Sequence, residues 1–307
     1  MNKYIAIDIG GTEIKYGILN EMGDLMEKAS CMTPSRQGGP AILKSVLDII
    51  MRIQNHVEIS GVCISTMGVV DTEKGEIIYA GKTAPNYAGI SYKKTIEDQF
   101  AIPCEVENDV NCAGLAEYLR GAGRGSRNMV CITVGTGIGG CAVLDGKILH
   151  GASDSAMEVG YLPVGSREFQ DIGATSILCR KVAERKQEPE NFWNGRRIFE
   201  TAQRGDRICE KAIDEMCDAL GKGIGGICYI LNPDVVVLGG GIMAQKEYLE
   251  PRIDKALKRY LKPMAYQALG LRFAALGNDA GMIGAFLHFM ERQKEKEDIR
   301  KEGSIVL

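Results

Sequence analysis

The sequence predicts an α/β protein that is built from two related halves. Short apolar runs of strand length alternate with segments of helical spacing along most of the chain. Two of these runs lead into glycine loops, each followed by a strand, a tight turn and another strand. Glycine accounts for 38 of the 307 residues, which favours many tight turns. The length allows one large domain or two ordinary ones with their own cores.

The first half opens with three expected strands. Tyr4–Ile9 is an apolar run that stops at Gly10, Tyr16–Leu19 is a second run, and residues 21–24 form the turn into a third at Leu25–Lys28. Beyond them the pattern predicts helices at 41–53, 92–100 and 109–119 and strands at 62–65, 77–79 and 104–107. Asp109 is therefore expected at the start of a helix that directly follows a strand.

The second half repeats this opening plan. Met129–Val134 and Cys141–Leu144 are expected strands around the glycine loop at 135–140, and Asp145-Gly146 is a hairpin turn into a third strand at Lys147–Leu149. The copies are separated by roughly 125 residues, too long for a solenoid period and suited to a duplicated domain. Further helices are expected at 175–185, 195–203, 206–231, 249–260 and 279–293, strands at 234–238 and 271–274, and a fraying charged tail at 291–303.

Charge and cysteine usage exclude several classes of protein. The 37 basic and 40 acidic residues give a net charge of −3, which argues against a dedicated nucleic-acid or anionic-membrane binder. We see no signal peptide and no apolar stretch long enough to span a bilayer. Ten cysteines without a C-x-x-C pair are expected to be reduced thiols of a cytoplasmic protein.

Glycine loops at the ends of strands are candidate phosphate sites, because glycine lets backbone N–H groups converge on an anion. They lie at residues 8–12, 135–140, 239–241 and 277–281. Thr12, Lys15 and Thr136 are additional donors. The alternative is that the glycines only close hairpins, but two copies at matching repeat positions favour phosphate. Residues 135–140 also match G-x-G-x-x-G, yet no helix follows, so a dinucleotide fold is not expected.

Two carboxylates accompany these loops. Asp8 ends the first strand, where it would repel phosphate unless a divalent cation intervened, so we expect a Mg²⁺ contact through water. The alternative is an aspartate that caps its own turn. Asp109, at the strand-to-helix junction, is placed to accept the proton of a substrate hydroxyl during phosphoryl transfer. Its alternative role is that of a helix N-cap.

The motifs also stand in the order of a known family. They are Asp8–Thr12, Glu107–Asn111, Thr133–Gly140, Glu158–Tyr161, Asn232–Gly241 and Ala280–Gly284. From about Lys3 to Phe289 the chain resembles the ROK family of sugar kinases and sugar-sensing repressors. The resemblance implies the actin-like, hexokinase-type ATPase fold, with two lobes from a duplicated βββαβαβα unit around a cleft. The expected lobes are residues 1–113 and 114–277, with a closing helix at 278–291 that returns to the first.

The resemblance also implies residue roles. Asp109 matches the base that activates the sugar 6-hydroxyl, Asn108 a residue that holds neighbouring hydroxyls, and Glu158 a glutamate that binds the reducing side of the sugar. The nucleotide positions that match the family are Asp8, Gly10, Gly11 and Thr12 in the first phosphate segment, Thr136 and Gly137 in the second, and Gly240 and Gly241 near the adenosine.

Three departures from the family pattern concern zinc and the sugar. Tyr161 occupies the position of a zinc-binding histidine, and residues 163–172 lack the cysteines of the usual zinc knot, so no structural zinc is expected. Asp171 aligns loosely with a sugar-contacting glutamate. This variant resembles the β-glucoside kinases, N-acetylmannosamine kinases and glucokinases of the family, which leaves recognition around C1 and C2 of the sugar open.

The sequence thus favours an ATP- and Mg²⁺-dependent hexose 6-kinase, which the resemblance implies is a homodimer. One alternative is a sugar-binding transcriptional regulator, which needs a DNA-binding segment for which residues 1–7 leave no room. Another is a non-catalytic sensor, which the joint presence of Asp8, Asp109 and both glycine loops argues against. Phe192 and Trp193 are expected to pack against the helix that follows them. His150 and His288 show no ligand spacing and are expected to be ordinary surface or core histidines.

Overall fold

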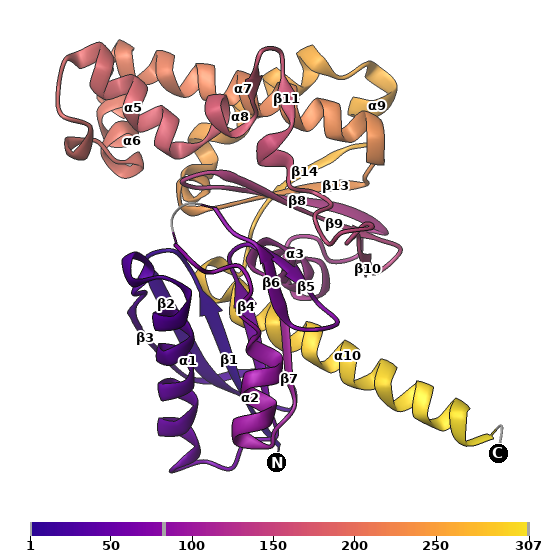
Figure 1. Cartoon of the computed structure of the whole chain (residues 1–307). Helices are drawn as coiled ribbons and strands as arrows, with labels where there is room; N and C mark the ends of the chain where they lie inside the picture. Colours follow the sequence, from indigo (N-terminus) through magenta and orange to yellow (C-terminus); the bar gives the residue numbers. More distant parts are fainter. Residues whose placement is uncertain (1, 82–83, 306–307) are drawn as a thin grey trace. The chain divides into compact units, whose positions relative to one another are not determined.

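A computed structural model describes residues 2–81 and 84–305. The chain divides into two compact units (Figure 1). The first unit contains the chain up to Ala116, the short segment His150–Ser155 and the chain from Asn278 onward. The second contains Glu117–Leu149 and Ala156–Gly277. Each unit has its own sheet and core.

The first unit is built on a five-stranded sheet of order β3-β2-β1-β4-β7. Its strands are β1 (Lys3–Ile9), β2 (Glu13–Asn20), β3 (Leu25–Met32), β4 (Gly61–Thr66) and β7 (Cys104–Asn108). Its helices are α1 (Gly39–Gln54), α2 (Tyr92–Phe100), α3 (Asp109–Arg120) and α10 (Ala280–Ile305). The shorter pieces are a hairpin of β5 (Val69–Asp71) and β6 (Glu76–Tyr79) and the 3-10 turns η1 (Ser35–Gln37) and η5 (Gly277–Asp279). Helix α3 runs across the boundary between the units.

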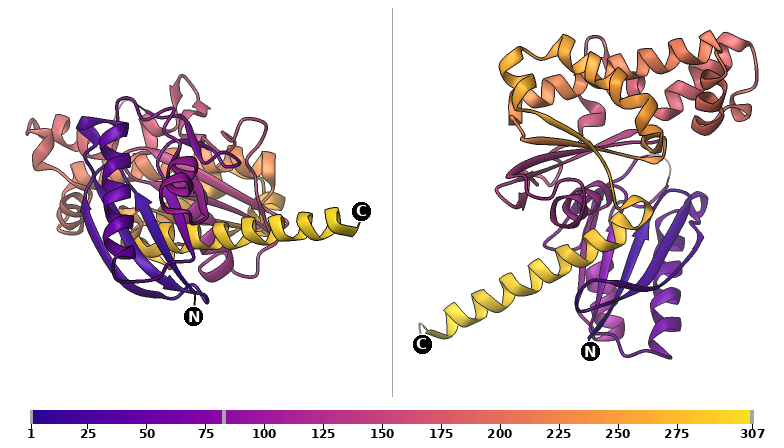
Figure 2. Two further views of the ribbon diagram at one scale, coloured as in Figure 1. Left: turned by 60° about the horizontal axis from the view of Figure 1, so that its bottom comes forward. Right: turned by 180° about the vertical axis from the view of Figure 1, so that it is seen from behind.

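Alternation along β1 places hydrophobic side chains on both faces of this sheet. Ile5, Ile7 and Ile9 are buried in a core with residues of α1 and α2, whereas Tyr4 and Ala6 belong to a second cluster with residues of α3 and α10. Since successive side chains of a strand point to opposite faces, α1 and α2 cover one face and α10 covers the other. In the right-hand view of Figure 2, which is seen from behind, α10 crosses in front of the strands of the first unit.

The second unit has a sheet of order β10-β9-β8-β13-β14. Its strands are β8 (Asn128–Val134), β9 (Ile138–Leu144), β10 (Lys147–Ile148), β13 (Val235–Gly239) and β14 (Gly270–Phe273). Its helices are α4 (Gln170–Gly173), α5 (Thr175–Lys186), α6 (Gly195–Gln203), α7 (Arg207–Leu231), α8 (Lys246–Tyr260) and α9 (Pro263–Ala268). The shorter pieces are β11 (Pro163–Val164), β12 (Arg167–Glu168), η2 (Val159–Tyr161), η3 (Glu190–Phe192) and η4 (Gly241–Gln245). Helices α5 to α8 pack their buried side chains against Val130, Ile132 and Val134 of β8.

The two sheets have the same plan, which confirms the predicted duplication. In the first unit β1 pairs antiparallel with β2 and parallel with β4. In the second unit β8 pairs antiparallel with β9 and parallel with β13. The outer strands continue the pattern, with β3 and β10 antiparallel and β7 and β14 parallel to their neighbours.

Helix α10 differs from the prediction, because its charged end does not fray. The helix continues to Ile305 instead of ending at 293, and its C-terminal half extends beyond the sheet (Figures 1 and 2). Arg292 forms an ion pair with Glu295 three residues on, and Lys296 binds the buried Glu105 of β7. Such pairs stabilise a polar helix. Among the described residues, no helix is both long and apolar enough to cross a membrane.

Glycine is required where α10 meets α3. A Cβ at Gly284 would lie 1.8 Å from the carbonyl oxygen of Cys112, whereas a Cβ at Gly226, exposed in α7, would meet nothing within 4 Å. We therefore expect Gly284→Ala to destabilise the protein by roughly 1–3 kcal/mol through overpacking. Gly226→Ala should stabilise it by about 0.5–1 kcal/mol, because alanine loses less conformational entropy in a helix. Urea unfolding measures the free energy of unfolding of both variants. Equal changes in the two variants would contradict the close approach of α10 to α3 at Gly284.

Candidate functional site

Asp8 lies near the end of β1 with its carboxylate engaged on both oxygens. Ser65 of β4 donates to Oδ1 at 2.7 Å, and the ammonium of Lys15 on β2 lies 3.5 Å from Oδ2. Gly281 in the first turn of α10 is so close that an added Cβ would lie 2.6 Å from the Asp8 carboxyl carbon. The positive end of the helix dipole therefore faces this carboxylate. Asp8 keeps 15% of its side chain exposed.

Hydrogen bonds to Glu13 and Thr33 fix the loop after β1. Gly10 donates its N–H to the carbonyl of Glu13 at 3.0 Å and accepts the Thr33 hydroxyl at 2.7 Å, and the carbonyl of Thr12 accepts the Thr33 N–H at 2.9 Å. Gly11 and Thr12 remain exposed. The predicted phosphate segment is thus a fixed loop with an exposed tip.

At the junction of β7 and α3, Asn108 is the N-cap. Its Oδ1 accepts the N–H groups of Val110 and Asn111 at 2.9 and 3.0 Å, and its Nδ2 donates to the carbonyl of Gly68 at 2.9 Å. Asp109 is the first residue of α3 and is half-buried, with Oδ1 accepting the N–H of Val110 at 2.9 Å. The capping role considered for Asp109 therefore falls mainly to its neighbour.

In the second unit, the corresponding loop is a tight turn between β8 and β9. The N–H of Gly135 donates to the carbonyl of Gly137 at 2.9 Å. The start of α5 is bound to this loop, because Thr175 donates its N–H to Gly135 at 2.9 Å and the Ser176 hydroxyl donates to the carbonyl of Thr136 at 2.6 Å. The N–H groups of a helix terminus thus lie next to the loop, an arrangement that favours an anion.

Gly240 follows β13 in a conformation that other residues rarely adopt. Its φ is +104°, and a Cβ would lie 2.2 Å from the carbonyl oxygen of Val134. Gly241 has open space around it. The glycine run therefore brings its backbone against the end of β8 without a side chain in between.

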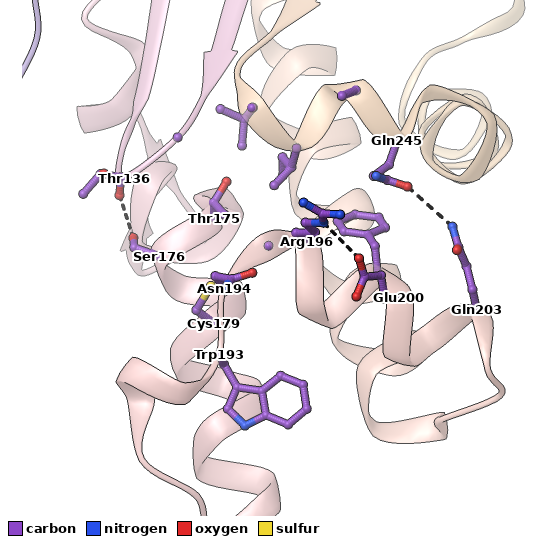
Figure 3. A pocket seen from close by; sticks show the side chains of 17 residues that line it. Thr136, Thr175, Ser176, Cys179, Trp193, Asn194, Arg196, Glu200, Gln203 and Gln245 are labelled. Atoms are coloured by element: carbon purple, nitrogen blue, oxygen red, sulfur yellow. Dashed lines mark hydrogen bonds and ion pairs between the residues drawn. The ribbon is translucent and has the colours of Figure 1, made fainter. Parts of the chain in front are cut away.

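These segments surround a cavity of about 920 Å³ (Figure 3), within the usual range for small-molecule sites. Its lining comprises Val134–Thr136 of the loop, Thr175, Ser176 and Cys179 of α5, residues 193–196, 199, 200 and 203 around α6, and residues 241, 242, 244 and 245 of η4. Arg196 bonds Glu200 at 2.9 Å and Gln203 bonds Gln245 at 3.4 Å. All of these residues belong to the second unit.

Sequence reasoning missed most of this lining. Thr136 and Gly241 were predicted site residues, but Thr175, Ser176 and Asn194 were not. The available signal was a hydroxyl-bearing or N-capping residue at the start of a predicted helix; Asn194 indeed caps α6 by accepting the N–H of Arg197 at 3.0 Å. Trp193 was expected only to pack; it is 7% exposed, donates to Glu188 at 2.8 Å and also lines the cavity.

Glu158 lies at the centre of a three-residue turn that follows an unusual backbone conformation at Met157. Met157 has φ of +67°, and the N–H of Val159 donates to its carbonyl at 2.6 Å, with Glu158 at φ −66° and ψ 53°. These angles describe an inverse γ-turn. Burial raises the pKa of the Glu158 carboxyl. The left-handed conformation of Met157 is of the strained kind that is concentrated at binding sites.

The other two predicted sugar-side residues are more exposed than Glu158. Tyr161, at the end of η2, has 45% of its surface exposed. Asp171, in α4, is exposed, and its carbonyl accepts a hydrogen bond from Arg167. Gln170, beside it, instead approaches the backbone of Gly137 and Gly160.

No metal cluster is formed within residues 2–81 and 84–305: no three His, Cys, Asp or Glu side chains lie together as they would around an ion. The ten cysteines are free thiols. A Mg²⁺ that accompanies phosphates needs only one or two protein carboxylates and keeps several waters. Asp8, partly exposed beside the first glycine loop, fits that mode, and the absence of zinc stays an expectation.

The predicted residues thus form two sets. Asp8, Gly10, Gly11, Thr12, Lys15, Asn108 and Asp109 belong to the first unit, and Thr136, Gly137, Glu158, Tyr161, Asp171, Gly240 and Gly241 belong to the second. Each unit thus carries a glycine loop after its first strand: the loop of the first unit lies beside the Asp8 carboxylate, and the loop of the second lines a cavity.

Comparisons with known proteins agree with the family that the sequence motifs indicate. Residues 4–292 match the model of the ROK family, and the chain belongs to that family. It is 46% identical to an uncharacterized protein of Clostridium perfringens, over 95% of this chain and 99% of the relative. It is 29% identical to a beta-glucoside kinase of Klebsiella pneumoniae, over 97% and 99%.

A solved structure of a ROK family glucokinase from Streptomyces griseus, in complex with glucose and AMPPNP, matches with a TM-score of 0.80. The two chains are 26% identical, and the match covers 92% of this chain and 98% of the glucokinase. The fold is therefore the hexokinase-type, actin-like ATPase fold, and two of these three relatives are named as a beta-glucoside kinase and a glucokinase.

Proposed function

We propose that the protein is an ATP-dependent kinase that transfers the γ-phosphate to the 6-hydroxyl of a hexose. The observation that carries the proposal is the cavity of about 920 Å³ beside the glycine loop of the second unit. The first unit of the same chain carries Asp8 and Asp109. The glucokinase structure with glucose and AMPPNP supports both ligand classes.

The nucleotide fits the second unit. Its adenosine would occupy the cavity next to Gly241, with Gly240 allowing close approach of the backbone. Its phosphates would meet the N–H groups of Gly137 and the start of α5 and the Thr136 hydroxyl, since glycine loops and helix N-termini bind phosphate. Gly10, Gly11, Thr12 and Lys15 form the corresponding segment of the first unit, and Asp8 would hold Mg²⁺ through water. That ion neutralises charge on the β- and γ-phosphates when bound.

Asp109 is the proposed general base. Its carboxylate would accept the proton of the 6-hydroxyl as the sugar oxygen bonds to the γ-phosphorus and the bond to the β-phosphate oxygen breaks, which releases ADP. Asn108, already fixed by the cap and by Gly68, would hold a neighbouring hydroxyl. Glu158 would bind hydroxyls at the reducing side of the sugar. These roles rest on the geometry of each unit and on the family resemblance.

A substitution at Asp109 tests the assignment of the base. We expect Asp109→Asn to lower kcat more than tenfold, because the amide cannot accept the proton, with little change in sugar KM. Asp98→Asn is the matched control, since Asp98 is an exposed carboxylate of the same unit. Steady-state ADP release measures both. A variant that keeps more than a tenth of the wild-type kcat would overturn the assignment.

The substrate class is proposed from Tyr161. A tyrosine with 45% of its surface exposed, in place of the family's metal-bound histidine, leaves the C1 side of the sugar free for an aglycone. The substrates that remain open are glucose, β-glucosides and N-acetylmannosamine. Comparison of kcat/KM for glucose, methyl β-glucoside, cellobiose and N-acetylmannosamine should show efficient use of the β-glucosides. A strong preference for N-acetylmannosamine would defeat this part of the proposal.

A further inference from the structure

Glu107, immediately before Asn108 and Asp109, is a buried carboxylate whose ion-pair partners are histidines. It is 1% exposed. The His150 Nε2 lies 2.6 Å from its Oε2, and the His288 Nδ1 lies 3.8 Å from the same oxygen. Within the described part of the chain, no lysine or arginine comes within ion-pair distance of it. A buried charge needs a partner of opposite charge, so His150 is the group on which this carboxylate depends.

The other oxygen of Glu107 holds the chain on both sides of Asp109. Oε1 accepts the N–H of Asn108 at 2.6 Å and the side-chain amide of Asn111 at 3.1 Å. Asn108 in turn caps α3. The position of the Glu107 carboxylate therefore affects the start of α3, where Asp109 is the first residue.

His150 reaches this place from a distant part of the sequence. It begins the segment His150–Ser155, which belongs to the first unit although the strands before it belong to the second. Its side chain is 28% exposed. The sequence pattern predicts an ordinary surface or core histidine here, and it does not reveal the pairing with a residue 43 positions away.

Charges around the pair favour the imidazolium form of His150. The hydrogen bond to Glu107 raises the pKa of His150 and outweighs the opposite effect of burial. Burial would raise the pKa of Glu107, but the hydrogen bond from His150, the charge of His150 and the hydrogen bond from Asn111 hold it below its usual value. Burial lowers the pKa of His288, so His288 is the neutral histidine of the two that lie next to Glu107. The other charged groups that face these three are Asp154 of the same segment, Arg292 of α10 and Glu105 of β7, with Asp71 and Glu73 acting on Asp154.

We propose that His150 and Glu107 form a positioning pair that fixes Asp109 for proton transfer. This inference rests on the proposed function. Without His150, the buried Glu107 carboxylate lacks its cationic partner and must take up a proton or shift toward water. Either change weakens its bonds to Asn108 and Asn111 and displaces the start of α3. Small displacements of a reacting group lower rates by as much as about 10²-fold.

The pair has a defined pH dependence. Because the pKa of His150 is raised in the folded protein, its contribution is complete below its ordinary pKa, about 6.5, and is lost as the pH rises through the raised value. The rate constant kcat should therefore fall on the alkaline side of that value.

Three variants test the proposal by steady-state kinetics. We expect His150→Phe to lower kcat 10- to 100-fold with less than a threefold change in sugar KM. His150→Gln, whose amide can still donate to Glu107 but carries no charge, should have at every pH the low kcat that the wild type reaches above the raised pKa, with no alkaline decline. His56→Gln, at an exposed histidine, should leave both unchanged. Wild-type kcat in His150→Phe, or an unchanged alkaline decline in His150→Gln, would overturn the proposal.

A histidine titration by NMR separates this inference from the proposed function. The full chain has three histidines, so the ring signals can be assigned with the His150 and His56 variants. One signal, lost in His150→Gln, should titrate above the ordinary histidine value, and Glu107→Gln should lower its midpoint. A raised midpoint in a protein without kinase activity would reject the proposed function alone. Kinase activity with an ordinary midpoint would reject the positioning pair alone.

Discussion

The close approach of α10 to the first sheet is the contact on which the first unit depends. It is made at two glycines, because a Cβ at Gly281 would lie 2.6 Å from the carboxyl carbon of Asp8 and a Cβ at Gly284 would lie 1.8 Å from the carbonyl oxygen of Cys112. Cys112 belongs to α3, whose first residue is Asp109. One helix therefore holds the end of β1 and the start of α3, the two places that carry the candidate carboxylates.

The second unit has the same sheet plan, but its first glycine loop has different surroundings. Its first glycine loop is bound to the start of α5 rather than placed next to a carboxylate, and its helices enclose a cavity of about 920 Å³. The duplication thus supplies two similar loops, and the surrounding residues differentiate them. In the proposed kinase, one loop acts with Asp8 and the other with the cavity.

Local patterns predicted the strands of the two five-stranded sheets, the glycine loops and the duplication, because apolar alternation and glycine runs are properties of neighbouring residues. The short strands β5, β11 and β12 were not predicted. The lining of the cavity was mostly out of reach, since Thr175 and Asn194 approach the loop only through tertiary packing. The pairing of His150 with Glu107 joins parts of the chain 43 residues apart, and no spacing in the sequence predicts it. The tail of α10 was expected to fray because its ion pairs with Glu73 and Glu105 cannot be read from the helix alone.

The central claim is that this fold transfers phosphate from ATP to carbon 6 of a hexose. The most direct measurement is phosphorus NMR of the product formed from Mg-ATP and glucose or a β-glucoside by the wild-type protein. A new phosphomonoester coupled to the two protons of carbon 6, formed in step with ADP, is the predicted result. Phosphate at another carbon, or no sugar phosphate with any hexose, glucoside or N-acetylmannosamine, would contradict the claim.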